Sequence, residues 1–526
     1  MRILRGRSRV DSRQSTVSRQ PSAVSGLSHC PLPTVHWLLL AFAVLTIALA
    51  LIALPMTSAV AVIGGALIAL ALLRWHAIAL YLAIVAVPFG SWFPISIGVG
   101  NLTAVDFAVA LLIVLWLARM IAVERGIAIR FPPLSFPFAL FLFAALVSIT
   151  GALSLQFALK ELTKWIEMFA VYVYVANNFD AAKIKRALAV MFIAGGAEAA
   201  IGIYQFLFRW GPEGFLLFGN YIRAFGTFEQ PNPFAGYLAL IIPVALGVVI
   251  AVFSMQFSVF RRRAREKTEH WILNTEYWLL ITACVSLAAM LAAVVMSWSR
   301  GAWLGVAAGL LVTVIVQSRR AFVLAIIAAF VFTFVVLLSS INLIPDAIAA
   351  RFSGIADYFG VFDVRGVRVD DANYALVERM AHWQAAWEML LARPAFGVGI
   401  GNYAATYPAY ALPRWDDPLG HAHNYYLNIA AETGFVGLIT YLWLWLAAFW
   451  QSWRAIRGAR GEWQSIAAGF LGMLVALSAH NVFDNLFVHG MAVQVGIGLG
   501  MIAVISNDKL QMTNEQTVKR NLSFAH

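Results

Sequence analysis

Three arginines and one histidine are the side chains of this sequence best suited to chemistry. Arg223 and Arg300 stand at the ends of long apolar segments, and Arg379 lies in a long stretch between two such segments. A guanidinium group is always charged, and its planar fork of donors matches phosphate oxygens, so several arginines together suit a pyrophosphate group. His423, which precedes a further apolar segment, can accept a proton near neutral pH, as activation of a hydroxyl nucleophile requires. The alternative interpretation is that each arginine lies at a membrane interface and reaches lipid phosphates.

Four sequence strings contain or adjoin these residues. They are G-T-F-E-Q-P-N-P-F-A-G-Y-L at 226–238, S-W-S-R-G-A-W at 297–303, R-M-A-H-W-Q-A-A-W-E-M-L-L-A-R-P-A-F-G-V-G-I-G-N-Y at 379–403, and H-A-H-N-Y-Y-L-N-I-A-A-E-T-G-F-V-G at 421–437. Two prolines in the first string place Asn232 at the mouth of the apolar segment that follows. In the second string, Arg300 and a glycine stand at an expected helix end, where the backbone can approach a neighbour closely.

Long apolar segments must position these residues. The 526-residue chain is 61% hydrophobic and only 12% charged, whereas a soluble globular protein is about a quarter charged. Because roughly 20 apolar residues span a bilayer, the sequence excludes a soluble enzyme and predicts an all-α polytopic membrane protein with about 12–14 transmembrane helices. The expected spans are 36–54, 57–73, 76–93, 103–121, 134–154, 158–178, 187–208, 233–257, 277–297, 302–317, 321–340, 424–450, 465–480 and 488–506.

The charges of the chain predict its orientation. The 37 basic and 26 acidic residues give a net charge of +11, and the basic excess falls in short clusters between apolar segments. Such clusters mark cytoplasmic loops, so we expect both termini in the cytoplasm, a location in the inner membrane and no nucleic-acid partner.

The same pattern divides the chain into five parts. They are a disordered basic tail at 1–35, spans 1 to 11 at 36–340, an extracytoplasmic loop at 341–423, spans 12 to 14 at 424–506, and a cytoplasmic tail at 507–526.

The extracytoplasmic loop contains a helical pattern. Apolar residues recur at helical spacing over 375–392 and predict an amphipathic helix on the outer membrane surface. The residues are Leu376, Met380, Trp383, Trp387, Leu390 and Leu391. Arg393 and Pro394 end the pattern.

Together the four strings resemble the O-antigen ligase and polymerase superfamily over roughly residues 200–500, most specifically in the pattern H-N-x-x-L-x-x-x-x-E-x-G-x-x-G. The resemblance implies a GT-C-like fold and a metal-independent, inverting transfer of a glycan without a cofactor. The implied donor is an oligosaccharide on polyprenyl pyrophosphate, and the acceptor is a hydroxyl group of a glycan, lipid or protein, among membrane lipids. Ligase, polymerase and protein-glycosylating members share this pattern, so the glycan, the acceptor and the oligomeric state stay open.

The resemblance also assigns roles to residues. Arg300 and Arg379 correspond to the arginines that hold the pyrophosphate, and His423 corresponds to the histidine that activates the acceptor. We expect four further residues to bind substrate: Arg223, Asn232, Asn424 and His480. His421 could share the role of His423, which we favour because it directly precedes asparagine.

Other polar residues have plainer interpretations. Glu432 is expected to have a structural partner, and the glycines at 397, 399 and 401 are expected to form a tight return toward the membrane. Asp370 with Asp371 and Asp416 with Asp417 lack a third ligand at suitable spacing, so no metal site is predicted.

Two groups of residues and one rival function stay open. His480, Asn481 and Asp484 could line the substrate cavity or satisfy one another. Lys160, Glu161 and Lys164 could form an interfacial pair or contact substrate. The rival function is a transporter or flippase of a lipid-linked saccharide, which would place its polar residues at the bilayer midplane.

Overall fold

The computed structural model describes residues 76–90, 95–97, 100–217, 219–263, 275–324, 326–327, 363–370 and 373–507. The described residues all belong to one compact unit, Leu70–His526. The predicted N-terminal tail, the first two spans, most of the eleventh span and nearly all of the predicted C-terminal tail lie outside the described residues.

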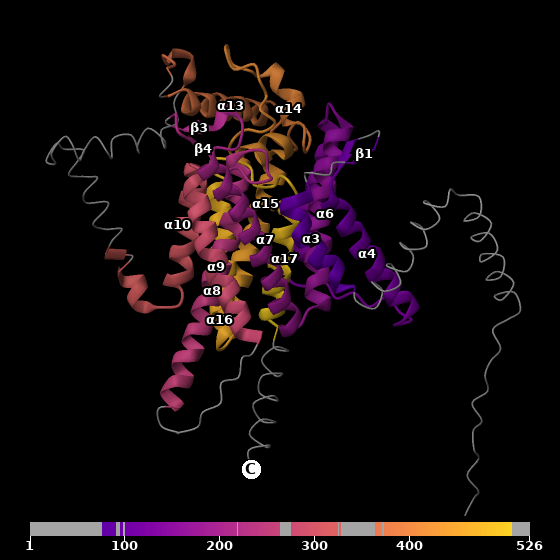
Figure 1. The fold of residues 1–526 in the computed structure, drawn as a ribbon. Coiled ribbons are helices and arrows are strands. Elements are labelled where there is room, and N and C mark those ends of the chain that lie inside the picture. Colours follow the sequence, from indigo (N-terminus) through magenta and orange to yellow (C-terminus); the bar gives the residue numbers. More distant parts are fainter. Residues whose placement is uncertain are drawn as a thin grey trace, which may run out of the picture. The chain divides into compact units, whose positions relative to one another are not determined.

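Long apolar helices make up the described part of the chain (Figure 1). They are α3 (Ala77–Phe89), α4 (Ala104–Ala122), α5 (Ser135–Ser148), α6 (Leu155–Asn178), α7 (Ala181–Phe208), α8 (Pro231–Arg263), α9 (Thr275–Met296), α10 (Arg300–Ile315), α15 (Tyr425–Gly458), α16 (Glu462–His480) and α17 (Met491–Ile505). Within the described residues, six helices are long and apolar enough to cross a membrane, and four shorter apolar helices accompany them. These helices confirm the prediction of an all-α polytopic membrane protein.

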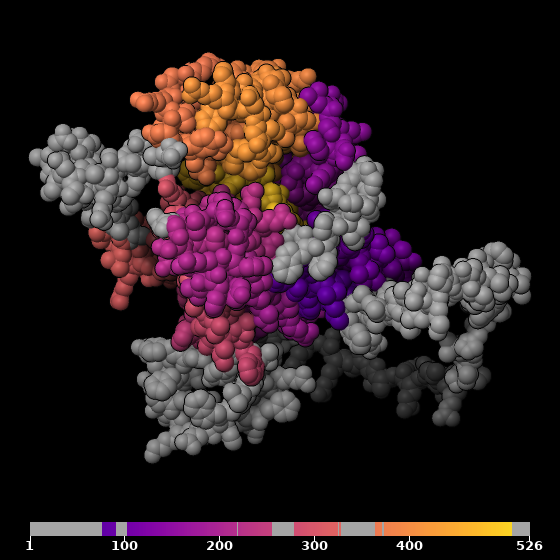
Figure 2. All heavy atoms as spheres, turned by 45° about the horizontal axis from the view of Figure 1, so that its top comes forward, coloured from indigo at the N-terminus to yellow at the C-terminus, as the bar shows by residue number. Residues whose placement is uncertain are grey.

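Short elements gather at one end of this helix bundle, which we call the α13 end. They include α13 (Tyr374–Ala392), α14 (Tyr403–Thr406), and strand β3 (Leu216–Leu217) paired antiparallel with β4 (Tyr221–Ile222). A second antiparallel pair joins β1 (Ile95–Ile97) to β2 (Gly100–Leu102). Figure 2 shows the orange residues of the α13 region gathered as one mass, with yellow atoms of the C-terminal segment visible beneath it.

The opposite end of the bundle carries the basic turns. Lys185 Nζ, near the start of α7, lies 2.8 Å from Glu462 Oε1 at the start of α16. The charges of Arg119, near the end of α4, and Lys183 act on His76, just before α3. Turns that the sequence assigns to a single side of the membrane therefore meet at one end of the bundle, away from α13.

Glycines bring α10 against α16. Gly301, Gly305 and Gly309 recur every fourth residue, and a Cβ on Gly305 would lie 2.9 Å from the Ala476 carbonyl oxygen. A Cβ on Gly309 would lie 2.7 Å from the carbonyl oxygen of Gly472. Small residues at this spacing let membrane helices approach closely. The packing sets the first residue of α10, Arg300, beside the last turn of α16.

A loop from another part of the chain interrupts α15. Gly434 has a φ of 67° inside this helix, and the Phe435 N–H donates to the Pro394 carbonyl at 2.8 Å. The Gly399 N–H donates to the Glu432 carbonyl at 2.9 Å, and the Val398 N–H donates to the Ala431 carbonyl at 2.9 Å. The loop thus supplies two donors and one acceptor that a continuous helix would supply itself.

The glycines of this loop form the predicted tight return. Gly397 has a φ of 68°, and a Cβ there would lie 2.4 Å from the Glu432 carbonyl carbon. Gly399 and Gly401 also have positive φ. A Cβ on Gly399 would crowd the backbone just before α6, and a Cβ on Gly401 would crowd the backbone within α6. Glu432 Oε1 accepts a hydrogen bond of 3.1 Å from the Tyr403 N–H, so the expected structural partner of Glu432 is confirmed.

The helix predicted at 375–392 is confirmed as α13, but its apolar stripe does not form one face. Met380 and Leu390 are buried in protein, whereas Trp387 is 47% and Leu391 is 52% exposed. Small side chains, Ala381 and Ala385 one turn later, also contact the rest of the protein. The helix therefore packs on protein through both small and large side chains, while Trp387 and Leu391 of the predicted apolar stripe stay exposed.

Candidate active site

His423 lies on the loop that leads into α15, and hydrogen bonds fix the start of that helix. Asn424 caps it, since its Oδ1 accepts from the Tyr426 N–H at 3.0 Å and the Leu427 N–H at 3.1 Å. The Tyr425 N–H donates to the Asn481 carbonyl at 2.8 Å, which joins this start to the end of α16. Asn424 therefore positions His423, and its side-chain oxygen is committed to the cap.

The backbone of His423 is strained. Its φ is 51°, in the left-handed region, which costs a residue other than glycine about 1–3 kcal/mol. Strain of this kind persists where the surrounding structure holds the residue in place, and it concentrates at functional sites.

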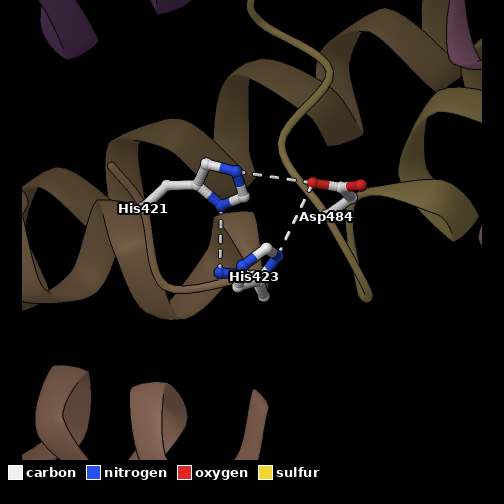
Figure 3. A group of neighbouring side chains, drawn as sticks. All are labelled: His421, His423 and Asp484. Atoms are coloured by element: carbon white, nitrogen blue, oxygen red, sulfur yellow. Dashed lines mark hydrogen bonds and ion pairs between the residues drawn. The ribbon is translucent and has the colours of Figure 1, made fainter. Parts of the chain in front are cut away.

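Two histidines face one carboxylate (Figure 3). His421 Nε2 lies 3.5 Å and His423 Nδ1 lies 3.9 Å from the same oxygen, Oδ1 of Asp484. The backbone N–H of His423 donates to His421 Nδ1 at 3.0 Å. The proton of a neutral His421 ring therefore resides on its other nitrogen, Nε2, which faces Asp484. When His423 carries its proton on Nδ1, also toward Asp484, its Nε2 keeps a lone pair for a substrate.

Burial and neighbouring charges set the protonation states of this group. Burial lowers the pKa of His423, and the charges of His421 and Arg379 lower it further. Burial likewise lowers the pKa of His421. Burial raises the pKa of Asp484, but His421, His480 and His423 outweigh burial and hold that pKa below its ordinary value. At neutral pH the site thus holds a neutral imidazole beside a carboxylate.

Three arginines share this region. Arg223 Nε donates to the Ser297 carbonyl at 2.9 Å, and its Nη2 donates to Asn232 Oδ1 at 3.4 Å. Burial lowers the pKa of Arg223, and the nearby charges of Arg379 and Arg300 lower it further. Within the described part of the chain, neither Arg223 nor Arg379 forms an ion pair with a carboxylate. Such a group of like charges is stabilised by an anionic ligand.

His480 connects the arginines with Asp484. It is the last residue of α16, only 1% exposed, and a Cβ on Gly301 would lie 3.1 Å from its Cδ2. Its Nδ1 has no hydrogen-bond partner among the residues that the structure describes. The seven residues that the sequence singled out therefore lie in one region, at the α13 end.

The structure adds residues that sequence reasoning left open or missed. Asp484 was one of three residues on a turn with two interpretations, and it is the carboxylate that both histidines face. His382 was missed: its Nδ1 lies 2.9 Å from the Tyr403 hydroxyl, and its ring centroid lies 5.7 Å from that of His423. Its position three residues after Arg379 was a signal, although spacing alone could not show which way its ring points.

The predicted pair on α6 is an ion pair at the edge of this site. Lys164 Nζ lies 2.6 Å from Glu161 Oε1 and donates to the Phe487 carbonyl at 2.6 Å. The charge of Lys164 acts on His421, whereas Lys160 is exposed. The pair therefore ties α6 to the turn that carries Asp484.

Among the residues that the structure describes, one group could hold a metal ion. The ligand atoms of His421, His423 and Asp484 lie within 4.8 Å of one another, and two imidazoles with one carboxylate suit zinc. The acids that the sequence singled out serve local turns, since Asp370 Oδ1 accepts from the Asn373 N–H and Asp417 Oδ1 accepts from the Leu419 N–H. Asp371 lies outside the described residues.

Comparison with known proteins supports one family. Residues 285–442 match the family model described as O-antigen ligase, a range that includes Arg300, Arg379 and His423. No curated protein matches the chain. A chain of a solved peptidoglycan synthase complex is 15% identical, with a TM-score of 0.38, over 72% of this chain and 98% of that one. That likeness is too weak to carry an argument. The match at 285–442 supports an assignment to the O-antigen ligase and polymerase superfamily.

Proposed function

We propose that this protein is a membrane glycosyltransferase that moves a glycan from polyprenyl pyrophosphate to an acceptor hydroxyl group. The observation that carries the proposal is the His423 imidazole, which faces Asp484 in the same region as three arginines. The family match supports glycosyl transfer, and the arginines favour a pyrophosphate as the leaving group.

The site chemistry has two parts. Arg300 and Arg379, with Arg223 beside them, hold the pyrophosphate and neutralise the negative charge that grows on it as it departs. His423 Nε2 takes the proton of the acceptor hydroxyl as that oxygen attacks the anomeric carbon. A bond forms between the acceptor oxygen and the anomeric carbon, the bond to the pyrophosphate oxygen breaks, and polyprenyl pyrophosphate leaves. Attack from the side opposite the leaving group inverts the anomeric configuration, and no metal ion or nucleotide sugar takes part.

Asp484 is a positioning residue in this mechanism. Its carboxylate favours the His423 tautomer with the proton on Nδ1 and stabilises the imidazolium ion that forms during attack. Asn424 holds the same histidine through the helix cap. Asn232 acts through its hydrogen bond to Arg223, and His480 faces the substrate from the end of α16.

The reaction takes place at the outer face of the cytoplasmic membrane in this proposal. The site lies at the α13 end, whereas the basic turns that mark the cytoplasmic side meet at the opposite end. Both termini are then cytoplasmic, and α13 with the following loop forms an extracytoplasmic cover over a GT-C-like arrangement of helices.

The test is product formation by the purified protein. A defined polyprenyl-pyrophosphate oligosaccharide is incubated with candidate glycan, lipid and peptide acceptors, and products are identified by mass spectrometry. We expect one acceptor class to gain the glycan while free polyprenyl pyrophosphate appears. Translocation of an unchanged lipid-linked saccharide across proteoliposomes, without any product, would instead support a flippase.

A further inference from the structure

A cavity of about 410 Å³ lies beside the proposed active site, between α13 and the segment before it. Its lining combines two indole rings with four hydrogen-bonding side chains, namely Trp383, Trp387, Asp363, Arg365, Gln384 and Glu388. Sites for small organic ligands are of comparable size, roughly 300–1,000 Å³.

The lining has the chemistry that recognises a sugar. One face of a pyranose ring presents C–H groups, which carry slight positive charge and pack on the electron-rich face of an indole. The hydroxyl groups at the ring edge pair with carboxylate, amide and guanidinium groups, which offer acceptors and donors in fixed planes. A lipid tail would leave the polar residues without partners, and a small anion would make no contact with the indole faces.

The cavity adjoins the arginine and histidine site through α13 and the start of α15. Arg379, Trp383 and Trp387 are spaced four residues apart on α13, so they follow one another along the helix at steps of about 6 Å. Trp383 Nε1 donates to the His423 carbonyl at 3.3 Å, and Leu427, one turn after His423, also lines the cavity. One step along α13 is comparable to the length of one sugar ring.

We infer that this cavity is a saccharide subsite, in which sugars of the lipid-linked donor stack on Trp383 and Trp387. The inference rests on the proposed function, because it takes Arg379 as a ligand of the donor pyrophosphate. The first donor sugar is covalently bonded to that pyrophosphate, so the sugars that follow it are within reach of the two indoles. Arg379 stands one turn before Trp383 on the same helix, which favours the donor as the occupant.

Binding without turnover tests the subsite. The probe is the water-soluble oligosaccharide that mild acid releases from the lipid-linked glycan of the source cells, and its affinity for the full-length protein is measured by calorimetry. We expect Trp387→Ala to weaken binding about tenfold and Trp387→Phe to retain most of it. Trp450→Ala is the matched control, since Trp450 is 64% exposed and lies toward the other end of α15. Equal affinities in the Trp387→Ala, Trp450→Ala and unsubstituted proteins would overturn the subsite.

A second measurement separates donor from acceptor and subsite from function. In the transfer assay, Trp387→Ala should raise KM for the donor and leave KM for the acceptor unchanged. A raised acceptor KM with an unchanged donor KM would overturn the donor assignment. Oligosaccharide binding that depends on Trp387, in a protein that transfers no glycan to any acceptor, would uphold the subsite while contradicting the proposed function.

Discussion

His421 and His423 face the same carboxylate oxygen but differ in the nitrogen that each leaves available. His421 uses Nδ1 to accept the His423 backbone N–H and directs Nε2 toward Asp484, so both of its nitrogens are engaged. His423 directs only Nδ1 toward Asp484, which leaves Nε2 for a substrate. The left-handed backbone of His423 makes this difference, because it turns the N–H toward His421 and the ring toward Asp484.

The first prediction follows from this difference. His423→Ala should lower kcat by about 10²–10⁴-fold, the usual contribution of a general base, while the protein still inserts and folds. His421→Ala should retain substantially more activity, because it removes a neighbour of the base and not the base itself. Transfer rates and thermal midpoints of both variants in detergent check this. If the His421→Ala variant were inactive and the His423→Ala variant active, His421 and not His423 would be the general base.

The second prediction concerns pH. Burial holds the pKa of His423 below that of an ordinary histidine, so kcat/KM should fall only when pH drops below the usual histidine range. The Asp484 charge opposes that shift, so Asp484→Asn should move the acid limb to still lower pH and reduce the maximal rate by up to about 10⁴-fold. A complete pH profile of both proteins is the measurement. An acid limb that moves upward in Asp484→Asn would contradict the electrostatic assignment.

The arginines lead to a third prediction. Arg300→Lys and Arg379→Lys keep the charge but lose the planar fork, so each should reduce kcat by about 10–100-fold. The loss should fall on kcat more than on KM if the contact strengthens as the leaving group departs. Near-normal kinetics for both variants would show that these arginines only reach lipid phosphates.

At the scale of elements, helix positions were predictable and helix interruptions were not. Hydropathy predicted a span at 424–450, and α15 does begin at Tyr425. Its break at Gly434 depends on contacts with the backbone of residues 394–399, which pattern reasoning along one segment cannot supply. The same holds for the face of α13 that packs on protein, since its contact partners lie in other segments of the chain.

The break leads to a fourth prediction. Gly434→Ala should destabilise the protein strongly, because the new Cβ would combine a positive φ with a distance of 2.4 Å from the Ala395 carbonyl carbon. Gly461→Ala is the matched control: Gly461 has a φ of 61°, but nothing lies within 4 Å of the place that its new Cβ would occupy. The control should lose only the penalty of its sparsely populated backbone conformation, about 1–3 kcal/mol. Equal shifts in the unfolding midpoint for Gly434→Ala and Gly461→Ala would show that the contact between the loop and Gly434 does not contribute to stability.

At the scale of the whole molecule, composition and charge clusters predicted the fold class and the gathering of the basic turns. The structure brings the seven candidate site residues into one region, and three of them are arginines, which are conspicuous among apolar segments. The partner of His423 stayed undecided, since Asp484 reaches the histidines only through the packing of α15, α16 and the turn after α16. His382 was missed because its ring direction depends on Tyr403 and Tyr407.

Direct displacement at the anomeric carbon without a metal ion is the central claim, and the stereochemistry of the product tests it most directly. The purified protein is given a donor of known anomeric configuration and an acceptor in the presence of EDTA, and the new linkage is assigned by NMR. We predict an inverted linkage, one polyprenyl pyrophosphate released per linkage formed, and a rate unchanged by EDTA. A retained configuration, or activity that EDTA removes and zinc restores at the His421, His423 and Asp484 group, would contradict this account.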